Sequence, residues 1–491
     1  MKILMVTAEA VPFAKTGGLA DAVSALSIEL EKLGHDVRIV LPRYYKIPRE
    51  TLRLLDGPMC VHCGSDEVWT AVYTENLTGS KNVPVYFIDH EQSFGRDGIY
   101  GTHSDPDFAD NPRRFSILCH SAFQLCRKLG WYPDIIHSHD WSAALAPVLL
   151  KFNERWTSEF SKTASVFTIH NLGYQGFYGK QNYPVLGLDW NNFYSSGFED
   201  YDNINFLKAG LVSSDMLTTV SPTYAKEIQR GEYGFRMDGI LRNRSGDLEG
   251  ILNGVDTVVW NPSKDKKIPA KYTPSTIEKK LQNKLALQER MGLEVNPDIP
   301  LFGIITRLVD QKGVAELFAP TYGCAFRMCA EMRIQLVALG SGESWCENEI
   351  NVLQSKLPNF RAYIGYNDEL SHLIEAGSDF FLMPSRYEPC GLNQMYSLLY
   401  GTLPIVRRTG GLADTVENYD EKTGNGTGFV FDNLTPDSIF DTAGWATYAW
   451  YNRPEHIKEM RLRGMKQKFG WNVSAEKYED VYKRALQKIG R

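Results

Sequence analysis

Two cations stand shortly after a strand that the apolar pattern predicts for residues 301–305. The following segment, residues 306–313, reads Thr-Arg-Leu-Val-Asp-Gln-Lys-Gly. It places Arg307 and Lys312 near the carboxyl end of that strand, where open α/β sheets bind ligands. Two fixed cations can neutralise a diphosphate leaving group without a metal. Taken alone, the same residues would also suit an exposed loop with ordinary surface charges.

Two nearly identical glycine loops occur in the two halves of the chain. Residues 15–23 read Lys-Thr-Gly-Gly-Leu-Ala-Asp-Ala-Val and residues 408–416 read Arg-Thr-Gly-Gly-Leu-Ala-Asp-Thr-Val, so seven of nine positions are identical. Two glycines that open a helix let the backbone approach an anion, and the helix dipole favours phosphate there. A pair of tight turns is the alternative. Neither copy is a dinucleotide-binding or Walker loop.

Polar residues close two further predicted strands of the first half. The strand at residues 165–170 ends in His170, and residues 135–141 read Ile-Ile-His-Ser-His-Asp-Trp. Because the carboxyl ends of parallel strands share one edge of a sheet, both groups should open on the same site. For His137 and His139 we favour hydrogen-bonded histidines over metal ligands, since the local pattern offers too few ligands.

A carboxylate follows the strand predicted for residues 379–383. The next segment reads Ser-Arg-Tyr-Glu-Pro-Cys-Gly-Leu over residues 385–392, so Glu388 lies on the loop that leaves the strand. A carboxylate there can bind sugar hydroxyls, or it can stabilise the start of the following helix. We expect Cys390 to be structural, with nucleophilic catalysis as the minor alternative because no histidine is adjacent in sequence.

Short β-rich runs alternate with helical patterns along the whole chain, which predicts an α/β fold with parallel strands and right-handed crossovers. A polar, proline-punctuated stretch at residues 261–269 has the character of a linker. We therefore predict two doubly wound, Rossmann-like domains, residues 1–256 and 257–491. The predicted strands are residues 2–7, 37–41, 83–89, 134–137, 165–170, 216–220, 301–305, 334–339, 362–364, 379–383 and 403–406.

Composition narrows the class of protein. With 491 residues, 43% hydrophobic and 23% charged, the chain should fold throughout, and its net charge of −6 without a long basic run argues against a nucleic-acid partner. The first apolar run is too short for a signal segment or a membrane span, so we expect no membrane association and a cytoplasmic location. Eight scattered cysteines are expected to be free thiols, and the lone pair Cys60 and Cys63 lacks further zinc ligands.

Taken together, the motifs resemble those of bacterial glycogen synthases and plant starch synthases, the retaining glucosyltransferases of GT-B fold that use nucleotide-activated glucose. The similarity runs nearly from end to end, and six ordered motifs in both halves are specific where one alone would be weak. The matching motifs include, in chain order, those around Lys15, His170, Asn253, Arg307, Glu388 and Thr409.

The resemblance implies a catalytic role for four residues. His170 would lie beside the transferred glucose, Glu388 would bind the sugar, and Arg307 and Lys312 would clamp the diphosphate. It also implies two domains that face a central cleft, with the acceptor on the N-terminal side and the donor on the C-terminal side. The last helix would then pack back on the first domain.

The resemblance further implies a set of substrate contacts. The loop that begins at Lys15 would touch the donor diphosphate and sugar, and the second glycine loop would supply backbone N–H groups. The expected contacts are Lys15, Gly17, Gly18, Asp21, Asp140, Asn171, Asn253, Tyr366, Cys390, Gly391, Leu392, Thr409, Gly410 and Gly411.

The sequence departs from related enzymes at two positions. Asn393 stands where some members have threonine, and Tyr396 stands where many other GT-B transferases have a second glutamate that grips the ribose. Recognition of the ribose is therefore not implied for this chain. Two Asp-x-Asp patterns, at residues 105–107 and 200–202, imitate the metal site of another glycosyltransferase fold, and we interpret both as coincidences.

The sequence thus predicts transfer of glucose from ADP-glucose, with UDP-glucose as the alternative, to the non-reducing 4-OH of an α-1,4-glucan with retention. No cofactor and no metal are expected. A catalytically inactive glucan-binding protein is the first rival, although the three cations of the proposed clamp are all present. A second rival is an oxidoreductase on the same kind of sheet, but the sequence lacks the dinucleotide-binding fingerprint that it would need. A phosphorylase would show the absorption band of pyridoxal phosphate.

Overall fold

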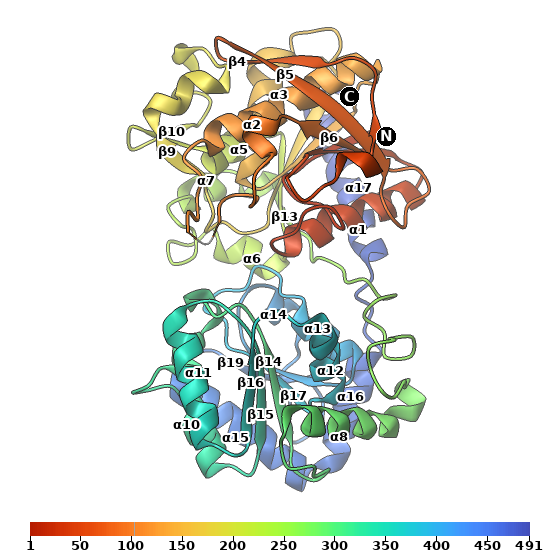
Figure 1. Cartoon of the computed structure of the whole chain (residues 1–491), viewed down its shortest axis with the longest axis vertical. Coiled ribbons are helices and arrows are strands. Elements are labelled where there is room, and N and C mark those ends of the chain that lie inside the picture. Colours follow the sequence, from red (N-terminus) through yellow and green to blue (C-terminus); the bar gives the residue numbers. More distant parts are fainter. Residues whose placement is uncertain (103) are drawn as a thin grey trace. The chain divides into compact units, whose positions relative to one another are not determined.

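The computed structural model describes residues 1–102 and 104–491, and it divides the chain into two compact units (Figure 1). Unit 1 holds Met1–Gly254 together with Trp471–Arg491, and unit 2 holds Val255–Gly470. The first segment of unit 1 ends two residues before the predicted boundary at residue 256, and the last 21 residues, which contain the final helix, group with unit 1. Each unit is described by itself below.

Unit 1 is built on a sheet with the strand order β13-β12-β8-β7-β1-β2-β6-β5-β3, with β4 paired to β5. Strands from β13 to β6 are parallel, whereas β3, β4 and β5 pair antiparallel. The strands are β1 (Lys2–Val6), β2 (Asp36–Pro42), β3 (Arg53–Leu54), β4 (Met59–Cys63), β5 (Asp66–Asn76), β6 (Pro84–Asp89), β7 (Ile135–His139), β8 (Ala164–Ile169), β12 (Met216–Thr219) and β13 (Leu248–Gly250).

Helices connect these strands, and a small second sheet of order β10-β11-β9 lies outside them. No helix in the part of the chain that the structure describes is long and apolar enough to cross a membrane. The elements are α1 (Gly18–Lys32), α2 (Glu91–Phe94), α3 (Asn111–Leu129), α4 (Leu145–Leu149), β9 (Phe177–Gly179), β10 (Glu199–Asp200), β11 (Asn203–Asn205), α5 (Phe206–Ser213), α6 (Pro222–Glu227), α7 (Asp238–Asn243) and α17 (Trp471–Lys488).

Helix α17 belongs to unit 1 because its apolar face is buried there. Trp471, Ala475, Tyr478 and Tyr482 recur at helical spacing and are all buried, and the helix packs against α1 and β8. The Ser474 hydroxyl donates a hydrogen bond to the main-chain oxygen of Leu252. The packing of the last helix on unit 1 thus follows from its pattern of apolar residues.

Unit 2 carries a fully parallel sheet of order β16-β15-β14-β17-β18-β19 with helices on both faces (Figure 1). Its elements are α8 (Lys280–Met291), β14 (Leu301–Ile305), α9 (Val314–Phe318), α10 (Ala325–Glu331), β15 (Gln335–Gly340), α11 (Ser344–Lys356), β16 (Phe360–Ile364), α12 (Asp368–Gly377), β17 (Phe380–Met383), α13 (Asn393–Leu399), β18 (Leu403–Arg407), α14 (Gly410–Thr415), β19 (Phe429–Phe431), α15 (Pro436–Asn452) and α16 (Pro454–Met465).

Successive residues of the central unit 2 strands enter different cores. On β14, Phe302 and Ile304 join one apolar cluster, which includes Met328 of α10, while Leu301 joins a second cluster, which includes Leu287 of α8. Side chains of a strand alternate between faces, so both faces of this sheet are covered by helices. This confirms the predicted doubly wound α/β architecture.

The strand orders also locate the ligand-binding edge of each unit. In unit 2, β14 lies between β15 and β17, and in unit 1, β1 lies between β2 and β7. At these positions the chain reverses its direction across the sheet, and open α/β sheets bind ligands at the carboxyl ends of the strands there. The loops after β1, β7, β14 and β17 are therefore expected to bind the ligand.

Candidate active site

A buried carboxylate organises the loop that follows β1. Glu9 is only 2% exposed, and its carboxylate accepts hydrogen bonds from the Thr16 N–H at 2.5 Å, the Thr16 hydroxyl at 2.7 Å and the Gly17 N–H at 3.3 Å. The Tyr100 hydroxyl donates to the same carboxylate at 2.8 Å. The Gly17 amide, expected to meet the donor, is thus held by Glu9 in this structure.

Glu9 was not among the predicted site residues. The available signal was a carboxylate three residues past a strand whose other members are apolar, since a buried charge needs partners and is rarely placed without a role. Lys15, which was selected, is exposed and pairs with Asp21 at 2.8 Å. Gly18 begins helix α1 directly behind this loop.

The loops after β7 and β8 are joined by a backbone hydrogen bond. Asp140 Oδ1 accepts the His170 N–H at 2.7 Å, and Asp140 itself adopts a left-handed φ of 55°. Burial raises the pKa of Asp140 to about 7, against the opposing effect of the backbone N–H groups of His170 and Asn171. This carboxyl therefore exchanges its proton near neutrality.

The raised pKa of Asp140 predicts a pH-dependent penalty on stability. A carboxyl whose pKa rises from 3.8 to about 7 on folding stabilises the folded state below pH 3.8, and this contribution is lost as the pH rises toward 7. Asp140→Asn does not titrate, so its stability should improve relative to the wild type by up to about 1.4 kcal/mol per pH unit in that window. Melting temperatures from pH 4 to 8 measure this difference.

The exposed Asp56→Asn serves as the control for this comparison, because its side chain lies at the surface of unit 1. Its melting temperature should follow the wild type at every pH. Parallel curves for Asp140→Asn and the wild type would contradict the prediction.

Two predicted substrate contacts of unit 1, Asn171 and Asn253, differ in whether their side-chain oxygen has a hydrogen-bond partner. The Asn171 side chain accepts the Gly173 N–H at 2.9 Å and so shapes its own loop. Asn253 is buried, and its Oδ1 has no hydrogen-bond partner among the described residues. A buried amide oxygen without a partner is costly, so Asn253 offers an acceptor for a ligand hydroxyl.

The three histidines at the carboxyl ends of β7 and β8 are hydrogen-bonded. His137 bonds the Tyr482 hydroxyl at 2.8 Å and the Thr168 hydroxyl at 2.6 Å, whereas His139 Nδ1 bonds His170 Nε2 at 3.1 Å. Burial lowers the pKa of His170 to about 3, so its ring is neutral at physiological pH. Within residues 1–102 and 104–491, no group of three or more histidine, cysteine or acidic side chains is placed to hold a metal ion.

In unit 2, the loops after β14 and β17 meet through an ion pair. Lys312 Nζ lies 2.5 Å from Glu388 Oε2, which also accepts the Ser385 hydroxyl at 2.8 Å. The carboxylate is 7% exposed and the ammonium 18% exposed, so the pair is largely desolvated. Arg307 is exposed and makes no side-chain hydrogen bond or ion pair with any residue that the structure describes. Of the two cations expected to clamp the diphosphate, Lys312 is thus paired with a carboxylate, whereas Arg307 is not.

The backbone of the second glycine loop packs directly against the backbone of the loop that carries Glu388. The Gly411 N–H donates to the Glu388 carbonyl at 3.1 Å. Gly410 has a φ of 42°, and a Cβ there would lie 1.9 Å from the Glu388 carbonyl, while a Cβ on Gly411 would lie 1.9 Å from that of Cys390. Both positions therefore require glycine because the two loops pack backbone against backbone.

The other predicted contacts of unit 2 are distributed around these loops. Cys390 is buried, Gly391 has a left-handed φ of 68°, and Leu392 caps helix α13. Thr409 is buried and caps helix α14. Tyr366 stands apart, with an 87% exposed side chain.

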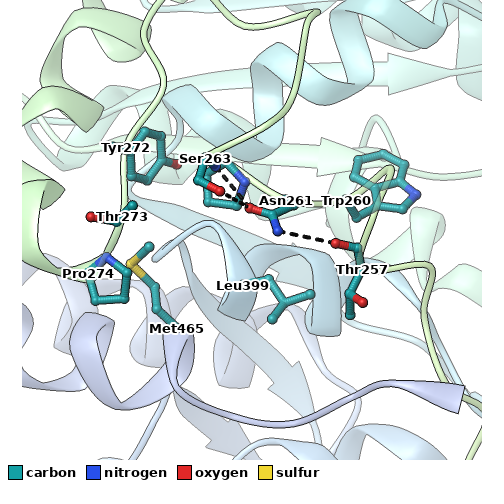
Figure 2. Close-up of a pocket in the computed structure, with 10 residues that line it drawn as sticks. Thr257, Trp260, Asn261, Ser263, Tyr272, Thr273, Pro274, Leu399 and Met465 are labelled. Carbon is teal, nitrogen blue, oxygen red and sulfur yellow. Dashed lines mark hydrogen bonds between the residues drawn. The ribbon is translucent and has the colours of Figure 1, made fainter. Parts of the chain in front are cut away.

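Unit 2 also contains a small cavity, whose lining includes Trp260, Tyr272 and Leu399 (Figure 2). Its volume is about 150 Å³, and none of the predicted site residues lines it. The Asn261 side chain bonds Ser263 and the Thr257 carbonyl beside it. Ligand pockets for drug-sized molecules run from about 300 Å³ upward, so this cavity is too small for a nucleotide sugar.

Two family models match successive parts of the chain. A family model described as the starch synthase catalytic domain matches residues 2–243, and one described as glycosyl transferases group 1 matches residues 288–445. A glycogen synthase of Treponema denticola is 67% identical over 488 residues, covering 99% of both chains. Glycogen synthase 1 of Geobacter metallireducens is 44% identical over 492 residues, covering 99% of this chain and 97% of that relative.

Solved structures show a similar fold. The catalytic domain of starch synthase IV from Arabidopsis thaliana, bound to ADP and acarbose, matches with a TM-score of 0.89 at 32% identity over 99% of both chains. Sucrose-phosphate synthase from Thermosynechococcus elongatus shares the fold alone, with a TM-score of 0.61 at 15% identity. Two α/β units with parallel sheets and these neighbours define a glycosyltransferase of GT-B fold. The chain belongs to the glycogen and starch synthase family, and its activity is that of a glycogen synthase.

Proposed function

We propose that the protein transfers glucose from ADP-glucose to the non-reducing 4-OH of an α-1,4-glucan with retention of configuration. The observation that carries the proposal is the pairing of Lys312 with Glu388 at the switch point of unit 2, beside the glycine loop at residues 409–411. The cations Arg307 and Lys312 at this edge suit a diphosphate. The starch synthase IV neighbour was solved with ADP and acarbose, which supports this choice of donor and acceptor.

Each group of residues has a distinct part in this proposal. Arg307 and Lys312 stabilise the negative charge that grows on the leaving diphosphate, and Glu388 binds sugar hydroxyls. The second glycine loop and Tyr366 contact the nucleotide side of the donor. His170 faces the transferred glucose, Asp140 and Asn171 line the sugar or acceptor side, and Asn253 contacts the donor.

Retention requires either two displacements or departure and attack on one face of the sugar. Glu388 is engaged by Lys312 and Ser385, and Asp140 is engaged by the His170 backbone. Neither carboxylate is left free to act as a nucleophile, and Cys390 is buried. We therefore favour departure of the diphosphate and attack by the acceptor on the same face.

A direct assay tests the proposal. The protein is incubated with glycogen and labelled ADP-glucose or UDP-glucose, and the glucose incorporated into polymer is measured. Incorporation from ADP-glucose at the higher rate is expected. Preference for UDP-glucose would overturn the donor, and no incorporation from either donor would favour the inactive glucan-binding alternative.

Transfer should not need a divalent metal. The cations Arg307 and Lys312 supply the positive charge that Mg²⁺ or Mn²⁺ would otherwise provide. We expect full activity in excess EDTA, measured as glucose incorporation after dialysis against the chelator. Loss of activity in EDTA with recovery on addition of Mg²⁺ would show that the clamp is assigned wrongly.

A further inference from the structure

Three histidine rings lie together at the carboxyl ends of β7 and β8. His137 and His139 are two residues apart on β7, so their side chains leave the same face of the sheet, and their ring centroids lie 4.1 Å apart. The His139 ring is 5.4 Å from the ring of His170, which directly follows β8. His137 and His139 are at most 1% exposed, whereas His170 keeps partial contact with solvent.

The six ring nitrogens have different partners. Both nitrogens of His137 are used, by Tyr482 and by Thr168. His139 Nδ1 bonds His170 Nε2 at 3.1 Å, while His139 Nε2 is fully buried without a partner among the described residues. His170 Nδ1 makes no hydrogen bond to any residue that the structure describes.

These partners determine where the protons lie. Burial lowers the pKa of all three rings, so each is neutral and carries one N–H and one bare nitrogen. Within the pair of His139 and His170, only one of the two bonded nitrogens can carry the proton. If it were His170, the proton of His139 would lie on Nε2 as a buried N–H without an acceptor, which is rare in native structures.

The opposite arrangement avoids this orphan donor. His139 then carries its proton on Nδ1 and donates it to His170 Nε2, and only a bare nitrogen stays unpartnered inside the protein. His170 Nε2 becomes an acceptor, so the proton of His170 must lie on Nδ1. That nitrogen has no partner within the described chain and belongs to the partly exposed ring.

We propose that His139 is a positioning residue that holds His170 in its Nδ1–H tautomer, so that His170 presents a hydrogen-bond donor to an oxygen of the transferred glucose. The choice of ligand rests on the proposed function of His170. The tautomer itself rests only on the geometry of unit 1. His137 supports the arrangement because its ring packs on His139 while Tyr482 and Thr168 fix both of its nitrogens.

The tautomer can be read directly from ¹⁵N spectra of the full chain labelled at histidine. The protein has 10 histidines, and comparison with His170→Ala and His139→Asn assigns the two rings. We expect His170 to be protonated at Nδ1 in the wild type and to show both tautomers in His139→Leu. Protonation of His170 at Nε2 in the wild type would overturn the proposal, whether or not His170 is needed for activity.

Kinetics test the positioning role. His139→Leu should lower kcat about tenfold, as expected for the loss of one oriented hydrogen bond, with the Kd for ADP unchanged within twofold. Asparagine places an amide near the position of Nδ1, so His139→Asn should recover most of the turnover. The exposed His62→Leu is the matched control and should behave as the wild type.

The outcomes separate this inference from the function of His170. If His139→Leu keeps full turnover while His170→Ala is inactive, His139 does not position His170 and the inference is wrong. If His170→Ala keeps full activity, the proposed role of His170 is wrong, and the ¹⁵N spectra still decide the tautomer. Should His139→Leu fail to fold, His139→Asn and the wild-type spectrum carry the test.

Discussion

Arg307→Ala is expected to lower turnover by about 10²–10³-fold, the range for losing one strong transition-state donor, while leaving the melting temperature unchanged. Negative charge grows on the diphosphate as the glycosidic bond breaks, so a cation already in place stabilises the transition state more than the bound donor. The Arg307 side chain is exposed and has no hydrogen-bond or ion-pair partner among the described residues, so its removal breaks no side-chain hydrogen bond or ion pair there. Initial rates at saturating ADP-glucose measure the effect.

Arg333→Ala provides the matched control for this experiment. Arg333 is also exposed, but it precedes β15 and therefore lies at the amino end of the same sheet, away from the ligand-binding edge. Turnover should be unchanged in this variant. Equal rates for Arg307→Ala and the wild type would remove Arg307 from the clamp.

Lys312 should behave differently because of its partner. Truncating it would leave the Glu388 carboxylate, which is 7% exposed, without its cation, and breaking such a pair is destabilising. Its effect on activity therefore includes a structural part that Arg307→Ala avoids. This contrast makes Arg307 the sharper test of the clamp.

The buried parallel strands were predictable because they are short, continuous apolar runs. The strand expected at residues 301–305 is β14, and those expected at 216–220, 379–383 and 403–406 agree with β12, β17 and β18 within one residue. Strands buried on both faces leave this signature. The loops that follow them could then be placed at one edge of each sheet.

The antiparallel part of the unit 1 sheet was not predicted. Along β5 the buried positions alternate and include Thr70 and Thr74 beside Val68 and Val72. A half-buried strand with threonine on its inner face gives a weak hydrophobic alternation, which sequence patterns do not resolve from polar loops. β5 pairs with β6 and so extends the unit 1 sheet, and this pairing forms only in the folded chain.

Contacts between distant segments were also beyond the sequence. Lys312 and Glu388 are 76 residues apart, and Glu9 and Tyr100 are 91 apart. Residue propensities and periodicity describe only residues that are close in sequence. They therefore do not predict which distant residues become partners. The residue types and their strand ends were predictable, whereas the partner of each charge was not.

Glu9 changes how the first glycine loop can bind an anion. A carboxylate that already accepts two backbone N–H groups of this loop places negative charge where a diphosphate was expected. Like charges at this distance repel, so this loop suits the sugar better than the diphosphate. The second glycine loop instead packs on main-chain oxygens of the Glu388 loop.

His170→Ala is expected to lower kcat by on the order of 10²-fold, the lower end for losing one oriented transition-state contact, while the Kd for ADP stays within about tenfold, or roughly 1.4 kcal/mol. The reason lies in where its groups point: Nε2 is bonded to His139, and Nδ1 has no partner among the described residues. The diphosphate contacts proposed for Arg307 and Lys312 belong to other loops and stay intact.

Calorimetric titration with ADP and initial rates of glucose incorporation separate these two effects. His62→Ala controls for loss of an exposed histidine in the same unit, and the melting temperature of His170→Ala shows how far the lost bond to His139 weakens the fold. A small drop is expected, because one buried hydrogen bond is removed and its net worth is about 1 kcal/mol. A variant with full kcat would exclude His170 from the reacting centre, whereas one with intact kcat and weakened ADP binding would move it to the nucleotide.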